Sequence, residues 1–67
     1  GFFKLKLDNE IENGELILIN SIGQKVYEQK ISYGENTIMT HGLNKGLYHC
    51  VLSQNKQKIP IGKLIVE

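Results

Sequence analysis

The stretch THGLNKGLYHCVLS, Thr40–Ser53, contains two glycines four positions apart, a lysine between them, a tyrosine, a histidine and the only cysteine of the chain. Gly42 and Gly46 flank Leu-Asn-Lys, a composition typical of a turn because glycine tolerates φ > 0. The residues after Gly46 alternate between two faces of an extended strand, with Tyr48, Cys50 and Leu52 on one face and Leu47, His49 and Val51 on the other. The stretch therefore predicts a turn that leads into a strand.

The same period-two alternation recurs along the chain and is interrupted by Gly, Asn, Asp and Ser, which indicates short strands. The expected strands are FFKLKL (2–7), ELILIN (15–20), KVYEQKI (25–31), NTIMT (36–40), the strand after Gly46, and KIPIGKLIVE (58–67). Turns are expected at DNEIENG (8–14), YGEN (33–36) and SQNK (53–56).

Three of these strands carry signals of their place in a sheet. ELILIN is apolar on both faces, which predicts a central strand, whereas the mixed KVYEQKI is typical of a strand near an edge. Pro60 cannot donate to a ladder and predicts an edge, a bulge or a break. About six or seven strands and no helical period predict an all-β antiparallel sandwich. Its expected core is Phe3, Leu5, Leu7, Leu16, Leu18, Ile22, Val26, Ile38, Leu43, Tyr48, Cys50, Leu52, Leu64 and Val66.

The length of 67 residues predicts one small domain that hides only ~60% of the surface of its unfolded chain. A single cysteine cannot form an internal disulfide, so we expect a module of a longer protein, steadied by its neighbour. Eight lysines, no arginine and a net charge of +1 argue against nucleic-acid binding. No apolar run reaches the roughly 20 residues that span a bilayer, and GFFKLKLDNE is not a secretory signal.

The residue types that usually carry chemistry do not form a site. GLNKGLY lacks the spacing and the Lys-Ser/Thr pair of a phosphate-binding loop. Cys50 is expected inside the sandwich and its neighbour His49 on the opposite face, so with His41 they fall short of a catalytic pair or a metal-ligand set. Asp8, Glu10, Glu12 and Glu15 fall in a polar turn without an apolar pocket. We expect no enzyme activity, cofactor or metal.

Five landmarks in order, GFFKL, NSIGQKVY, GENTI, LNKGLYHCVL and GKLIVE, resemble the C-terminal sorting domain, type A, of proteins exported by the type IX secretion system of Bacteroidetes. The resemblance implies a compact Ig-like sandwich, here residues 1–67, attached to the end of a larger secreted cargo. It further implies passage through the periplasm, recognition by an outer-membrane translocon and, in many members, removal by a sortase-like cysteine peptidase at the cell surface.

The family's late Gly-x-Tyr falls on Gly46 and Tyr48, and its terminal Lys-apolar element falls on Lys63, Leu64, Ile65 and Val66. These six residues are the expected sorting motif. The exposed edge of the terminal strand is expected to offer backbone groups to a receptor. The chain has Asn20 where the family often has Asp, and Glu67 where a basic residue is frequent. The Asn-Pro that commonly comes before the first glycine would precede Gly1.

The alternative function is an Ig-like accessory module for adhesion or carbohydrate binding. Such a module normally exposes aromatic side chains as stacking platforms for sugars. The chain has no tryptophan, and only Tyr27 and Tyr33 are expected to face outward. The sequence therefore favours the export signal.

Overall fold

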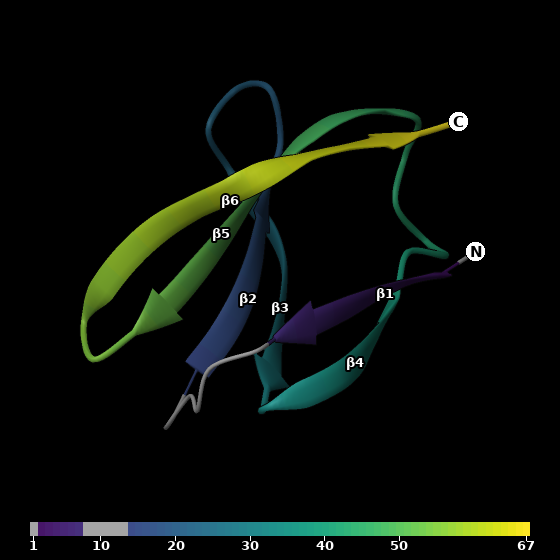
Figure 1. The fold of residues 1–67 in the computed structure, drawn as a ribbon. Helices are drawn as coiled ribbons and strands as arrows, with labels where there is room; N and C mark the ends of the chain where they lie inside the picture. The colour runs from purple at the N-terminus through teal and green to yellow at the C-terminus, as the bar shows by residue number, and fades with distance from the viewer. Residues whose placement is uncertain (1, 8–13) are drawn as a thin grey trace.

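The computed structural model describes residues 2–7 and 14–67, and this part of the chain folds into six strands without a helix. The strands are β1 (Phe2–Leu7), β2 (Gly14–Ile19), β3 (Lys25–Ile31), β4 (Gly34–Met39), β5 (Gly46–Gln54) and β6 (Gln57–Val66). They form two antiparallel sheets, β1-β4 and β3-β2-β5-β6 (Figure 1). The predicted all-β sandwich is confirmed. Most of the predicted turn DNEIENG lies outside the described residues.

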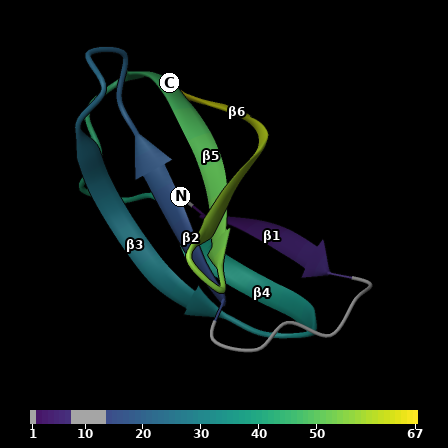
Figure 2. The same cartoon turned by 90° about the vertical axis from the view of Figure 1, so that its left-hand side faces the viewer.

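The order of the larger sheet agrees with the patterns of the strands. Strand β2 lies between β3 and β5, as its two apolar faces predict, and β3 forms one edge (Figure 2). Strand β6 forms the other edge. Its register against β5 shifts where Cys50 pairs with Gly62 and Val51 pairs with Pro60, which leaves Ile61 as an extra residue. Pro60, which predicted an edge, a bulge or a break, therefore lies in an edge strand next to a bulge.

The turns follow from local chemistry. Asn55 and Lys56, both with positive φ, join β5 to β6 in a two-residue hairpin of the kind whose twist matches the flanking strands. Between β4 and β5 the Leu43 N–H donates to the Thr40 carbonyl at 3.1 Å. Gly42, at φ +90°, occupies the third position of this turn, where a type II turn requires positive φ. Both turns were predicted from the sequence.

The core lies between the two sheets and is small. Its buried residues are Leu16, Leu18, Ile31, Ile38, Cys50 and Leu52. Half-buried apolar side chains surround this cluster, namely Phe3, Leu5, Leu7, Tyr27, Leu43 and Leu64. Only Leu16, Leu18 and Ile38 are fully buried among the larger side chains of the described chain. Most of the predicted core is confirmed, with Val66 half-buried at its margin.

Four expectations were wrong. Ile22 is 75% exposed in the turn after β2, and Val26 is 39% exposed because it faces away from the core. On the same strand Tyr27 packs against the core instead of facing outward, and Ile31 is a core residue that the prediction missed. The expected turn YGEN is shorter than predicted, since β4 already begins at Gly34.

Candidate functional site

The two parts of the sorting motif, well separated in the sequence, are direct partners in the structure. Strands β5 and β6 pair so that Gly46 lies opposite Val66 and Tyr48 lies opposite Leu64. Lys63 lies opposite His49 on the other face of the sheet. The sequence marked the motif residues but not this pairing. The antiparallel register assembles them into one patch at the edge of the larger sheet.

The inward-facing motif residues belong to the structural framework. Tyr48 is buried, and its hydroxyl donates a 2.5 Å hydrogen bond to the backbone carbonyl of Asn44. This bond is of the same kind as the tyrosine corner of immunoglobulin-like sandwiches, in which a tyrosine hydroxyl bonds to the backbone a few residues upstream. Leu64 packs against the core cluster beside it. Changes at these two positions would therefore act on stability first.

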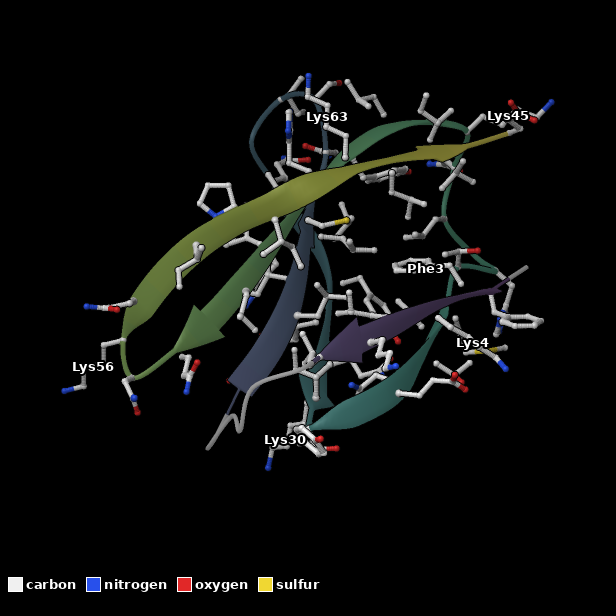
Figure 3. The ribbon with its side chains drawn as sticks, in the orientation of Figure 1. Phe3, Lys4, Lys30, Lys45, Lys56 and Lys63 are labelled. Atoms are coloured by element: carbon white, nitrogen blue, oxygen red, sulfur yellow. The ribbon has the colours of Figure 1, made fainter. Side chains whose placement is uncertain are left out.

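The outward-facing motif residues are open to solvent. The Lys63 side chain points away from the sandwich (Figure 3), and Ile65 is 69% exposed. Their cross-strand partners, His49 and Leu47, are exposed on the same face. A lysine beside an exposed isoleucine offers a partner one positive charge and an apolar contact. Among the side chains of the expected motif, those of Lys63 and Ile65 are exposed.

Gly46 fixes the start of β5. Its φ is +153°, a region that L-residues rarely adopt, so the predicted positive φ is confirmed. The glycine sets the direction in which the chain leaves the turn and enters the strand. Through the register, it also sets the position of Val66 at the end of β6.

Two other landmarks of the sequence organise turns. The Asn20 Oδ1 accepts hydrogen bonds from the backbone N–H groups of Ile22 (3.2 Å) and Gln24 (2.8 Å), so the asparagine caps this turn. Asn36, which the sequence reasoning assigned to an open turn, is buried instead. Its Nδ2 donates to the carbonyls of Ser32 and Gly34, and its Oδ1 accepts from Ser32 N–H. The signal that could have identified Asn36 is an asparagine directly after a Gly-Glu turn.

The potential metal-ligating side chains of the described residues do not cluster. Residues 2–7 and 14–67 contain no cluster of three His, Cys, Asp or Glu side chains that could hold a metal ion. Cys50 is buried, and burial raises the pKa of its thiol, which opposes formation of a reactive thiolate. His49 is exposed on the opposite face. Of the early carboxylates, Asp8, Glu10 and Glu12 lie outside the described residues.

Comparison with known proteins identifies the family. Within the described part of the chain, no helix has the length and apolar character to cross a membrane. No curated protein matches the sequence, and no solved structure does either. Residues 1–67, the whole chain, match the family described as the secretion system C-terminal sorting domain. The chain therefore belongs to the family of type IX secretion C-terminal sorting domains.

Proposed function

We propose that this sorting domain directs an attached cargo protein across the outer membrane, and that its receptor reads the outward side of the β5–β6 patch. The proposal rests on one observation: the residues of the expected motif divide between the two faces of the larger sheet. Tyr48 and Leu64 hold the edge of the sandwich in shape, while Lys63 and Ile65 project from the same edge strand into solvent. A folded edge with exposed side chains suits recognition of a folded signal by a translocon.

Two finer steps belong to the same proposal. The cargo passes through the periplasm before it reaches the translocon, and a sortase-like peptidase removes the domain at the cell surface. Both steps are supported by membership of the family of C-terminal sorting domains. The domain acts as a substrate of this machinery.

The experiment is an export assay with a periplasm-targeted fluorescent reporter fused to residues 1–67, in a host that has the type IX system. The intact fusion is expected to reach the surface or the medium. The exported reporter should be shorter than the fusion by the length of the domain if a peptidase removes it. Deletion of Lys63–Glu67 should leave the reporter in the periplasm. Because this deletion also removes Leu64 from the core, it cannot separate recognition from folding.

Variants of exposed residues separate an effect on recognition from an effect on folding. Lys63→Glu and Ile65→Ser change exposed side chains and are expected to melt like the parent domain while reducing export. Lys30→Glu and Val26→Ser are matched controls on the outward face of β3, the opposite edge strand, and should be exported normally.

Three results would contradict the proposal or part of it. Normal export of both Lys63→Glu and Ile65→Ser would move recognition elsewhere on the domain. An exported reporter that keeps the full length of the fusion would remove the peptidase step. If the intact fusion stays in the periplasm while a known sorting domain exports the same reporter, the accessory-module function takes the place of export.

A further inference from the structure

The two sheets of the sandwich differ in width. Neighbouring strands lie about 4.8 Å apart, so the two strands β1 and β4 span roughly half the width of the four-stranded sheet. On the β3 side the sheets are tied by a hydrogen bond of 3.0 Å from Gln29 Nε2 to the Thr37 carbonyl of β4. Strand β1 lies on the side toward β6 (Figure 1). The smaller sheet therefore covers the β3 side and leaves the inner face of β6 incompletely covered.

The exposed fractions of the side chains along one row of cross-strand partners show this incomplete coverage. The uncovered space beside the inner face of β6 is called the gap. Leu16, Leu52 and Ile59 are successive partners on β2, β5 and β6, and partners on neighbouring strands share a face. Leu16 and Leu52 are buried, at 0% and 9% exposure, but Ile59 is 45% exposed. Leu64 and Val66 further along β6 are half-buried. An apolar inner face thus remains open to solvent along β6.

A cleft of about 380 Å³ lies at one end of this gap. Its walls are formed by Phe2 and Phe3 of β1, by the segment Thr40–Leu43, and by the end of β6 from Leu64 onward. Figure 3 shows the Phe3 side chain directed into the space between β1 and β6. Apolar side chains from both sheets line the cleft together with the polar side chains of Thr40, His41 and Glu67.

Two free strand edges border the gap, and they differ in regularity. Among the described strands β1 pairs with β4 alone, in a register without interruption over all six of its residues. Strand β6 carries Pro60, a bulge and then Gly62 at φ +157°. Proline and bulges are devices that protect an edge from pairing with another strand. The regular edge of β1 is therefore the better template for an added strand.

The side chains of β1 define the sequence that would fit beside it. Phe3, Leu5 and Leu7 face the core, while Lys4 and Lys6 face solvent. Opposite charges stabilise cross-strand pairs and like charges destabilise them. A second copy of the domain would place Lys4 opposite Lys4 or Lys6 of its partner, so self-pairing at this edge is unfavourable. The Lys4 ammonium lies 3.3 Å from the Glu35 carboxylate of β4, but the Lys4 side chain stays 57% exposed. Lys4 and Lys6 thus remain open on the outward face, and an incoming strand with acidic residues on that face matches them in charge.

We propose that the sandwich accepts one extended strand of alternating apolar and acidic residues, supplied by a component of the export machinery. The strand adds to the free edge of β1, and its apolar side chains cover Ile59, Leu64 and Val66 on the inner face of β6. This proposal rests on the proposed function, because it names the chemistry of the partner that handles the signal. It concerns a surface distinct from the outward side chains of Lys63 and Ile65.

The test is direct binding of a fluorescein-labelled peptide of about eight residues in which glutamate and valine alternate. The 67-residue chain should raise the anisotropy of this peptide, and an alternating lysine-valine peptide should not bind. In two-dimensional NMR spectra, the glutamate-valine peptide should shift the amide signals of β1 and the methyl signals of Ile59. Signals of β3, on the far side of the larger sheet, should not move.

Variants distinguish specific strand addition at the edge of β1 from nonspecific hydrophobic binding of the peptide. Ile59→Ser should weaken binding by at least about tenfold, whereas Ile22→Ser, which alters another exposed isoleucine in the turn between β2 and β3, should bind like the parent chain. A double variant, Lys4→Glu with Lys6→Glu, should reverse the preference and bind the lysine-valine peptide. Melting curves of Ile59→Ser and Ile22→Ser should match the parent, so that loss of binding is not loss of fold. The double variant removes the exposed Lys4–Glu35 ion pair and places a glutamate opposite Glu35, so its peptide binding is measured well below its own melting midpoint.

Four results would overturn the proposal. These are no binding of the glutamate-valine peptide up to about 1 mM, shifts confined to the outer edge of β6, equal effects of the Ile59 and Ile22 variants, and self-association of the chain without peptide. The export assay is independent of this binding test. Export of the intact fusion together with failure of peptide binding would reject the strand proposal and leave the sorting function standing.

Discussion

At the scale of single residues, Gly46 is the clearest case of a position fixed by backbone geometry. A side chain at this site would meet no atom within 4 Å, so space is not the constraint. The constraint is φ of +153°, which costs an L-residue of order 1–3 kcal/mol. Gly46→Val is therefore expected to lower the free energy of unfolding by about 1–3 kcal/mol in urea titrations.

The neighbouring Lys45→Val is the control for that variant. Lys45 is exposed and has no positive φ, so its replacement should change stability by less than about 0.5 kcal/mol. Equal stability of the parent chain and Gly46→Val would show that the start of β5 accommodates a side chain without strain.

Cys50 makes a prediction about pH. Burial raises the pKa of its thiol above the ordinary value of 9.0, so the folded state keeps the proton that the unfolded chain releases. The stability linked to this group is fully present below pH 9.0 and is lost as the pH rises through the folded pKa. Free energies of unfolding should therefore decline more steeply above pH 9.0 in the parent than in Cys50→Ser.

Cys50→Ser itself should cost about 1–3 kcal/mol at neutral pH, because it places a hydroxyl in an apolar site without a partner. Export of the Cys50→Ser fusion should persist, since the thiol has no role in recognition. Parallel pH profiles for the two proteins would show that the thiol is not responsible for the alkaline loss. A stable variant that is not exported would give the thiol a function.

At the scale of strands and their connections, Asn36 holds the passage from β3 to β4. Its amide makes three hydrogen bonds to the backbone of Ser32 and Gly34 from a buried position. Asn36→Ala should lower the free energy of unfolding by about 1–3 kcal/mol, since it removes three part-buried hydrogen bonds to the backbone. Asn44→Ala, at an exposed asparagine, should stay within about 0.5 kcal/mol of the parent. Similar losses for both would mean that the Asn36 bonds contribute little.

The strands themselves were predictable to within a few residues, because alternation and turn residues are local signals. The sequence did not predict correctly which residues of β3 face the core. Val26 was assigned to the core, although that choice turns Glu28 and Lys30 inward as well. The register shows that Tyr27 lies opposite Leu18 and Ile31 opposite Gly14, with Val26 left over at a shift in the pairing. Counting the charged residues on each face would have favoured the correct side.

The candidate site was predictable as a set of residues but not as a surface. The motif letters identify Tyr48 and Lys63, and the alternation along each strand places Tyr48 and Leu64 on the core face, yet nothing local reveals that these two residues are cross-strand partners. That pairing depends on the register between two strands, which shifts at the bulge at Ile61. Pairing between strands is a non-local property, so a single sequence leaves it open.

At the scale of the whole molecule, the central strands of the domain pair on both sides, whereas the strands at its margins pair on one side only. Strands β2 and β5 each have a neighbour on both sides, whereas β1, β3, β4 and β6 each pair on one side within the described chain. The fully buried Leu16 and Leu18 both lie on β2. The surfaces assigned to recognition, the end of β6 and the edge of β1, lie at the margins.

Amide hydrogen exchange should reveal this gradient. Local opening requires less free energy where few buried contacts are broken, and segments that bind partners tend to come from that end of the scale. Amides of β2 and β5 are expected to exchange most slowly. Those of β1 and of Lys63–Val66 should open at a free energy lower by about 1 kcal/mol or more. The glutamate-valine peptide should slow exchange in β1 while leaving β3 unchanged. Uniform protection across all six strands would mean that the sandwich opens only as a whole, and the margins would then need no partner to complete them.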